Sequence, residues 1–164
     1  QWRSFTVDVD LEFTAGDRGY LFAHGDQGGG YGLYVDHGDE LVFVHNGYGK
    51  LAELHCGAVD PSARSIRVEV SAPGHWRWNV EVLVDGEVRG RIDDLLMLGA
   101  MAPFEGIDVG IDRRSPVSWA IHEEHGTFPW TGVLRAVTFT PGEPAPDAGT
   151  RFVDMLREIG MRYE

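Results

Sequence analysis

Acidic and histidine side chains gather in and beside one long stretch of irregular sequence, residues 112–130. Carboxylate oxygens are the hard ligands that Ca²⁺ prefers in proteins, whereas imidazole nitrogens suit transition metals. His122 and His125 flank two glutamates here, so a transition metal is an alternative to calcium. A solvated acidic loop explains the same pattern, because the chain contains 26 acidic residues. The residues that we expect to hold Ca²⁺ are Asp108, Asp112 and Glu123.

Aromatic residues outside the regular strand patterns indicate a second kind of chemistry, the binding of sugars. Sugar rings stack on exposed aromatic side chains and are oriented by nearby polar groups. Trp76 and Trp119 are tryptophans that no strand pattern buries, and His122 and His125 follow Trp119 closely in the sequence. These four residues are the predicted ligand-binding set. Packing of the two tryptophans against a partner domain is the alternative interpretation.

The sequence contains no recognisable catalytic group. Glycoside hydrolysis needs two carboxylates that face each other across one cleft. Asp8, Asp10 and Glu12 instead share the polar face of one predicted strand, where solvated charges are expected. Cys56 is the one cysteine, which excludes an internal disulfide and a cysteine-rich zinc site. We therefore predict no catalytic residues in this chain.

The net charge of −12 excludes two classes of partner. A strongly acidic surface repels phosphates, and the release of counterions from phosphates drives most nucleic-acid binding. Binding to anionic membranes is disfavoured for the same reason. The longest apolar stretch, residues 95–102, has eight residues, whereas a membrane-spanning helix needs about 20. We therefore expect neither nucleic acid nor membrane as a partner.

Alternation of apolar and polar residues is the dominant pattern along the chain. Every second residue is apolar over 5–13, 66–70 and 78–84, which predicts strands with one buried and one solvated face. Asn46-Gly47 and Asp85-Gly86 are typical of hairpin turns. About ten short strands without intervening helices predict an all-β fold, a two-sheet antiparallel jelly-roll sandwich.

The C-terminal tail has a different composition. Residues 141–149 are rich in proline and glycine and are predicted to form a linker between a β-sandwich domain, 1–140, and a helix, 150–164. Apolar residues recur at helical spacing in this tail, which predicts one C-terminal amphipathic α-helix. A helix this short is marginally stable alone, so we expect it to dock on the sandwich or on another chain. The apolar positions are Phe152, Leu156, Ile159 and Tyr163.

Three groups of segments, taken in order, resemble the C-terminal domain of bacterial arylsulfatases. More loosely, they are similar to concanavalin A-like and laminin G-like jelly rolls. The resemblance covers about residues 4–140 and implies a concanavalin A-like β-sandwich, in which laminin G-like members often bind calcium at a sheet edge. The segments are 19–25, 29–35 and 41–46; then 82–88; and then 108–112, 115–117 and 128–134.

The catalytic part of a sulfatase does not accompany this resemblance. Sulfatase activity requires a cysteine or serine within a Cys/Ser-x-Pro-Ser/Ala-Arg signature, and Gly57 and Ala58 follow Cys56. Ser71 begins such a pattern, but Gly74 and His75 stand where it requires Ser/Ala-Arg. The chain alone is therefore predicted to be non-catalytic. The single cysteine and the lack of a signal-peptide pattern after Gln1 favour the bacterial cytoplasm.

Two functional hypotheses remain open. The first is a non-catalytic accessory domain that packs on a sulfatase catalytic domain or on a second copy of itself. The second is a stand-alone lectin-like module that binds a glycan. A concave groove lined by Trp76 and Trp119 would favour the lectin, whereas a flat apolar face near the chain ends would favour the accessory domain.

Overall fold

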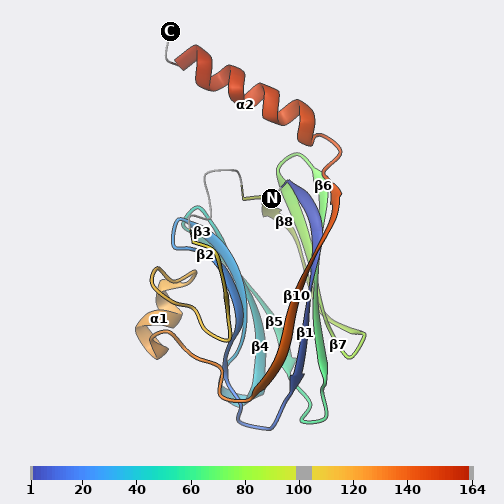
Figure 1. The fold of residues 1–164 in the computed structure, drawn as a ribbon, viewed down its shortest axis with the longest axis vertical. Coiled ribbons are helices and arrows are strands. Elements are labelled where there is room, and N and C mark those ends of the chain that lie inside the picture. The colour runs from blue at the N-terminus through green and yellow to red at the C-terminus, as the bar shows by residue number, and fades with distance from the viewer. Residues whose placement is uncertain (1, 99–104, 163–164) are drawn as a thin grey trace.

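Two five-stranded antiparallel sheets dominate the computed structural model, which describes residues 2–98 and 105–162. Figure 1 shows them face to face as two layers. Sheet A has the order β10 (Val133–Pro144), β1 (Arg3–Glu12), β6 (Ser65–Gly74), β7 (Arg77–Val84) and β8 (Glu87–Leu96). Sheet B has the order β5 (Lys50–Ala58), β4 (Glu40–Gly47), β3 (Gly29–Val35), β2 (Gly19–Asp26) and β9 (Ile107–Val109). The predicted two-sheet β-sandwich is confirmed.

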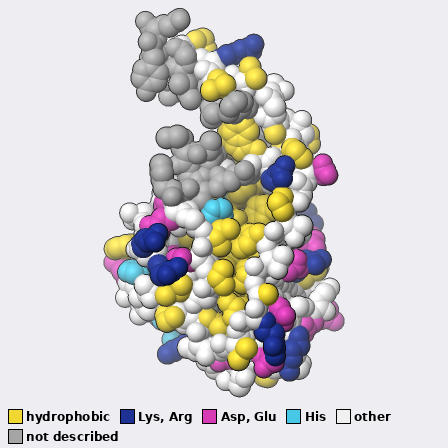
Figure 2. All heavy atoms as spheres, in the orientation of Figure 1, with side chains coloured by type: hydrophobic (Ala, Val, Ile, Leu, Met, Phe, Trp, Pro, Cys, Tyr) yellow, Lys and Arg dark blue, Asp and Glu magenta, His cyan; other side chains and the backbone are white. Residues whose placement is uncertain are grey.

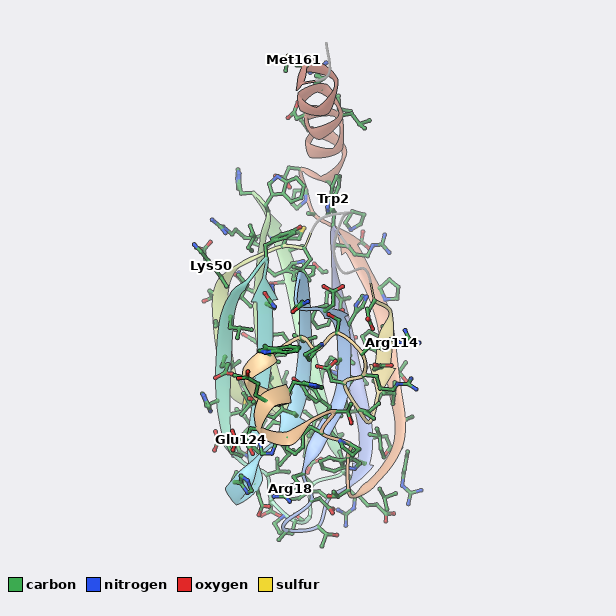
Figure 3. All side chains as sticks on the ribbon, turned by 90° about the vertical axis from the view of Figure 1, so that its left-hand side faces the viewer. Trp2, Arg18, Lys50, Arg114, Glu124 and Met161 are labelled. Atoms are coloured by element: carbon green, nitrogen blue, oxygen red, sulfur yellow. The ribbon has the colours of Figure 1, made fainter. Side chains whose placement is uncertain are left out.

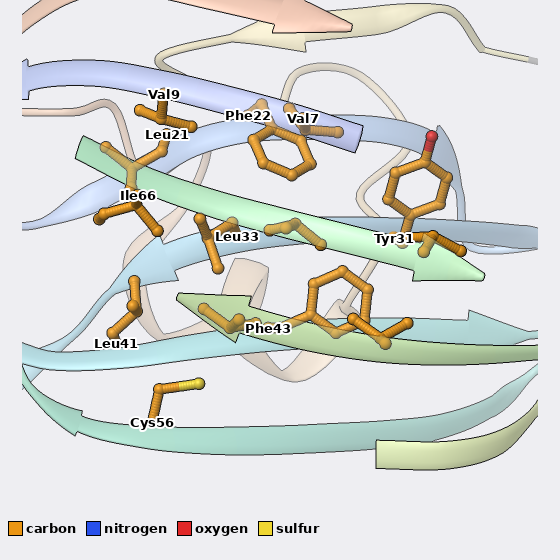
Figure 4. Packing of buried hydrophobic residues seen from close by; sticks show 14 of the residues in the cluster. Val7, Val9, Leu21, Phe22, Tyr31, Leu33, Leu41, Phe43, Cys56 and Ile66 are labelled. Atoms are coloured by element: carbon orange, nitrogen blue, oxygen red, sulfur yellow. The ribbon is translucent and has the colours of Figure 1, made fainter. Parts of the chain in front are cut away.

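The main hydrophobic core lies between the two sheets. Alternation in β1, β6 and β7 turns one face of sheet A inward, as the sequence predicted. Trp78 on β7 is the largest fully buried side chain and contacts Phe5 and Tyr31 edge-on. Cys56 is buried in the same core, and Figure 4 shows it beside Leu41 and Phe43.

The three central strands of sheet B are buried on both faces, whereas its edge strands β5 and β9 are more exposed. Strands β2, β3 and β4 therefore lack the alternation of sheet A, and almost all their residues are buried. A second apolar cluster covers the outer face of this sheet, and Figure 1 shows helix α1 (Trp119–His125) lying against that face. Its members are Tyr20, Ala23, Tyr34, Val42, Val44, Val117, Ile121 and Phe128.

The structure differs from the sequence prediction at helix α1 and at the turn predicted for Asn46-Gly47. The stretch 112–130 was predicted as loop, but Ser118 caps a helix of seven residues there and Gly126 ends it. So short a helix buries one side chain, Ile121, and leaves no periodic pattern. Asp85-Gly86 forms the predicted turn, whereas the β4–β5 turn lies at Tyr48-Gly49, both at positive φ, and not at Asn46-Gly47.

The C-terminal segment departs from the predicted linker. Residues 141–144 belong to β10, because Pro141 pairs with Phe5 and Pro144 with Arg3 on β1. Helix α2 (Ala148–Arg162) follows and extends away from the sandwich (Figure 1). Position 163 of the predicted apolar stripe lies outside the described residues. Within the described residues, no helix combines the length and apolar character needed to span a membrane.

Candidate functional site

A depression of about 350 Å³ crosses the outer face of sheet A. Its floor is formed by outward-facing polar side chains of all five strands, so the alternation that buries the core residues also builds this surface. One such side chain from each strand lies directly opposite one on the neighbouring strand, so the five side chains form a row across the sheet. The row is Thr140, Thr6, Glu69, Glu81 and Arg91, and we call the depression the polar groove.

A second row of side chains completes the polar groove nearer the N-terminus. Ser71 lies opposite Asn79, and both line the groove together with Ser4. The Asn79 side-chain oxygen accepts a hydrogen bond from the Asp94 backbone at 3.0 Å, which fixes the amide on the sheet. The groove therefore offers hydroxyl, amide, carboxylate and guanidinium groups on a rigid strand floor.

The charges in the polar groove are held by neighbouring ion pairs. Arg91 donates to Glu81 at 2.8 Å and to Asp93 at 2.9 Å. The Arg91 guanidinium is permanently charged, as arginine is in proteins, and hydrogen bonding to Asp93 raises its pKa further. Glu69 lies directly opposite Glu81 on the same face, and like charges at such a pair reduce sheet stability. Each carboxylate has an arginine beside it, Arg67 at 3.7 Å from Glu69 and Arg91 at 2.8 Å from Glu81, which offsets this repulsion.

The two predicted tryptophans lie at separate places outside this groove. Trp76 follows β6 and packs edge-on against Trp2, with ring centroids 5.1 Å apart, near the base of α2. Trp119 is 52% exposed at the start of α1 and stacks on His122 at 5.3 Å. Figure 1 shows these two regions at the end and at the side of the sandwich. Of the predicted ligand-binding set, Trp119 and His122 are in contact.

The three predicted calcium ligands are engaged separately. The Asp108 carboxylate pairs with Arg113 at 2.9 Å, and Glu123 is exposed on α1. Asp112 is 2% exposed and accepts a hydrogen bond from the Val117 backbone at 2.9 Å. Burial raises the pKa of Asp112 to about 6. Its contacts make it an anchor of the segment that covers sheet B, and the three carboxylates do not converge on one point among the described residues.

A different group of metal-ligating side chains is brought together on the sheet B side. Asp36, His37 and His125 place one ligand atom each within 4.8 Å of the others, and no other such group of three occurs in the described residues. His125 belongs to the predicted ligand-binding set. The other two residues are 88 or more positions away in sequence, at the end of β3, so only the docking of α1 on sheet B reveals the group.

Comparison with known proteins identifies the architecture. No protein-family model matches the chain, and no curated protein matches it. Several solved structures are similar to the chain. Domains LG4-5 of the mouse laminin alpha1 chain give a TM-score of 0.57 at 13% sequence identity, and the match covers 84% of this chain and 35% of the laminin chain. The CBM40 of the Ruminococcus gnavus IT-sialidase gives a TM-score of 0.53 at 13% identity, over 84% of this chain and 74% of that one. The fold is a concanavalin A-like β-sandwich.

A third similar structure is a pentraxin. The SAP-like pentraxin of Limulus polyphemus matches with a TM-score of 0.52 at 13% identity, over 84% of this chain and 63% of that one. The chain thus spans about a third of the laminin chain and under two thirds of the pentraxin. At identities this low, the structural similarity establishes the concanavalin A-like fold alone. None of these matches is specific to an arylsulfatase.

Proposed function

We propose that this concanavalin A-like domain binds a glycan in the polar groove of sheet A. The observation that carries the proposal is the row of side chains from Thr140 to Arg91, which spans all five strands of an open sheet face. Adjacent sugar hydroxyls both donate and accept hydrogen bonds, and the groove supplies both kinds of partner. The similar CBM40 structure solved with α2,3-sialyllactose supports this class of ligand.

The charges of the groove favour a neutral sugar. Among the residues that line the groove, Glu69 and Glu81 supply two carboxylates and Arg91 supplies one guanidinium, while Arg67 pairs with Glu69 at 3.7 Å from outside the lining. A sialylated or sulfated sugar would be repelled by both carboxylates, whereas neutral hydroxyls can donate to them. We therefore expect neutral oligosaccharides to bind more tightly than acidic ones.

A matched pair of arginines on the same sheet face tests the proposal. Arg91 lines the groove and pairs with Glu81, whereas Arg135 lies outside the lining and pairs with Glu12, which does not line the groove either. A glycan array followed by titration calorimetry should show saturable binding that Arg91→Gln abolishes or weakens at least tenfold, about 1.4 kcal/mol. Arg135→Gln should bind like the natural chain.

The same measurement is repeated with calcium and with a chelator. Binding should persist in chelator, because the metal-ligating group of the described residues lies on the opposite sheet. Equal losses in both arginine variants, or no saturable binding to any glycan, would reject the polar groove as a glycan site.

A second candidate function is packing against a partner, as in an accessory domain. Val153 and Leu156 on α2 are 45% and 51% exposed. Hydrophobic side chains also line the opening between the two sheets, where a depression of about 160 Å³ reaches Trp78 (Figure 2). Exposed apolar surface of this kind is typical of interaction sites. The partner implied by the sequence resemblance is a sulfatase catalytic domain; the partner that this chain can test alone is a second copy.

Substitutions on two sides of α2 test self-association. Leu156 and Met161 are both exposed, but five residues at 100° each place them about 140° apart around the helix. Light scattering over a range of concentrations should show a dimer for the natural chain and for Met161→Asp, and a monomer for Leu156→Asp. A natural chain that is monomeric throughout would exclude self-association through α2.

A further inference from the structure

The cluster of Asp36, His37 and His125 lies where α1 approaches the turn between β3 and β4. Asp36 directly follows β3, and its Oδ1 accepts a hydrogen bond from the His37 backbone at 2.7 Å. This contact begins a short 3₁₀ turn, His37–Asp39, in which Gly38 adopts a positive φ of 72°. The turn therefore presents a carboxylate and an imidazole from adjacent residues toward α1.

His125 reaches this turn from the last position of α1. Its ring stacks on Phe128 with centroids 4.1 Å apart and an interplanar angle of 14°. Phe128 is fixed in turn, because its carbonyl accepts a hydrogen bond from Tyr20 of β2 at 2.9 Å. The Gly19 position beside it packs so tightly on Pro129 that a Cβ would collide with the backbone. His125 is thus held by packing before any ligand binds.

The unusual feature of His125 is a buried nitrogen without a partner. The side chain is 10% exposed, and Nε2 has no hydrogen-bond partner among the described residues. A buried polar atom that lacks a partner costs free energy, so native proteins rarely retain one without a reason. Asp36 Oδ1 lies 3.5 Å from this nitrogen and Glu124 Oε1 lies 3.7 Å from it, which is too far for a hydrogen bond.

These separations match the spacing of ligands around a metal ion. Two ligands about 2.1 Å from a tetrahedral ion lie about 3.4 Å apart. The His125–Asp36 distance is close to this value, and one His37 nitrogen lies within 4.8 Å of both atoms. Two imidazoles with a carboxylate suit Zn²⁺ and related transition metals, whereas calcium prefers oxygen ligands alone.

We propose that Asp36, His37 and His125 form a binding site for a divalent transition-metal ion. The ion joins α1 to the β3–β4 turn and satisfies the buried nitrogen of His125. A neighbouring cavity of about 370 Å³, lined by Arg18, Glu124 and His125, gives access from solvent. Figure 3 shows Arg18 and Glu124 around the lower end of α1. Glu124 is placed to act as a further oxygen ligand.

Arg18 is the one described cation in contact with the cluster. Its Nη1 lies 3.4 Å from His37 Nδ1, so the guanidinium competes with a metal ion for this imidazole. Removal of this positive charge should strengthen metal binding, and removal of the Asp36 charge should weaken it. These opposite signs distinguish a specific site from general loss of structure, because an unfolded variant cannot bind more tightly.

The test is a Zn²⁺ titration of the full chain without a histidine tag, in competition with a chromogenic chelator. We expect a single ion per chain, visible-range absorbance of tetrahedral type with Co²⁺, and a higher melting temperature with Zn²⁺. Asp36→Asn and His125→Gln should each weaken Zn²⁺ binding by more than about 100-fold. Loss of a residue that only hydrogen-bonds to a metal ligand weakens binding by roughly 10- to 100-fold. Arg18→Gln should tighten it.

His55 supplies a matched control. This exposed histidine also lies between two carboxylates, 3.6 Å from Glu40 and 3.7 Å from Glu53, but outside the cluster. His55→Gln should bind Zn²⁺ like the natural chain, and all variants should melt cooperatively in chelator. Natural affinity in Asp36→Asn and His125→Gln, or an equal loss in His55→Gln, would overturn the proposal.

Discussion

The two sheets of this domain have the same number of strands but opposite outer faces. The outer face of sheet A is open, polar and crossed by ion pairs such as Arg67–Asp8, 2.6 Å, and Arg91–Glu81, 2.8 Å. The outer face of sheet B is covered by residues that lead into and out of α1 and form a second apolar cluster. One sheet thus exposes its outer side chains to solvent, and the other uses them for packing.

This difference decides how each candidate site is built. The polar groove uses side chains whose positions follow from strand alternation and register alone. The metal-ligating cluster depends instead on one segment docking over another, since His125 reaches Asp36 only after Ile121 and Phe128 pack on sheet B. We therefore expect substitutions on the covered face to affect stability and metal binding together, and substitutions on the open face to lower stability only slightly and to leave metal binding unchanged.

The largest expected effect comes from breaking the cover of sheet B. Ile121→Ala removes a side chain that is 8% exposed and should cost about 3 kcal/mol of unfolding free energy. Leu83→Ala removes a similar side chain from the outer face of sheet A, where it is half-buried, and should cost about 1 kcal/mol or less. Urea unfolding of both variants measures the difference.

The reactivity of Cys56 provides a second measurement of the stability difference between Ile121→Ala and Leu83→Ala. Its thiol is buried, and burial raises its pKa to about 12, so a thiol reagent should react only when the sandwich opens. Labelling should accelerate in Ile121→Ala and remain slow in Leu83→Ala. Equal stability of the two variants would contradict a packed outer face on sheet B.

An intermediate effect is expected from the buried carboxyl of Asp112. Its pKa of about 6 exceeds the ordinary value of about 3.9, so the folded state favours the protonated form. Below about pH 4 the carboxyl is protonated in both the folded and the unfolded state, so it does not oppose folding. As the pH rises through about 6, the folded state must bury a charged carboxylate, and the unfolding free energy falls. Asp112→Asn avoids this loss and should be more stable than the natural chain by about 2 kcal/mol at neutral pH.

The difference for Asp112→Asn should shrink toward zero below about pH 4, which a series of urea unfolding curves across pH measures. Asp93, exposed on the open face and paired with Arg91, is the control. Asp93→Asn removes an exposed ion pair and should change the unfolding free energy at neutral pH by about 1 kcal/mol or less. A difference for Asp112→Asn that stays constant with pH would argue against a buried, titrating carboxyl.

The smallest effect is expected for the ion pairs of sheet A. Asp8→Asn removes the 2.6 Å pair with Arg67, but both side chains are well exposed. Exposed pairs contribute about 0–1 kcal/mol, and salt screens them. The loss in unfolding free energy should be below about 1 kcal/mol at low salt and should vanish at high salt. A large loss that persists in high salt would mean that the open face also stabilises the fold.

Prediction from sequence succeeded where structure depends on near neighbours. Alternation placed Val7, Val9 and Val80 in the core, and Asp85-Gly86 formed its hairpin turn. The sequence prediction placed the β4–β5 turn two residues too early, at Asn46-Gly47. The Asn46 side-chain oxygen accepts a hydrogen bond from the Gly49 backbone in the turn, and its amide donates to the carbonyls of Gln27 and Val117. That role joins β4 to distant segments, and no local pattern encodes it.

The residues of the candidate sites also differ in whether local sequence or long-range contacts determine their positions. Outward-facing residues such as Glu81 and Arg91 follow from the strand pattern, but the sequence does not show that they belong to one row, because register between strands is a long-range property. Trp119, His122 and His125 were named from the sequence as ligand-binding candidates, but the closeness of His125 to Asp36 and His37 was not predicted. Asp36 and His37 look like ordinary turn residues until α1 lies beside them.

The amino-acid sequence by itself determined a two-layered β-sandwich with a helical tail, because period-two burial and turn residues act over a few positions. Only the tertiary structure decided which outer face is open, which rows of side chains align and which histidine meets which carboxylate. Those outcomes depend on apolar segments far apart in the chain excluding water together, and that free energy is gained only when they meet.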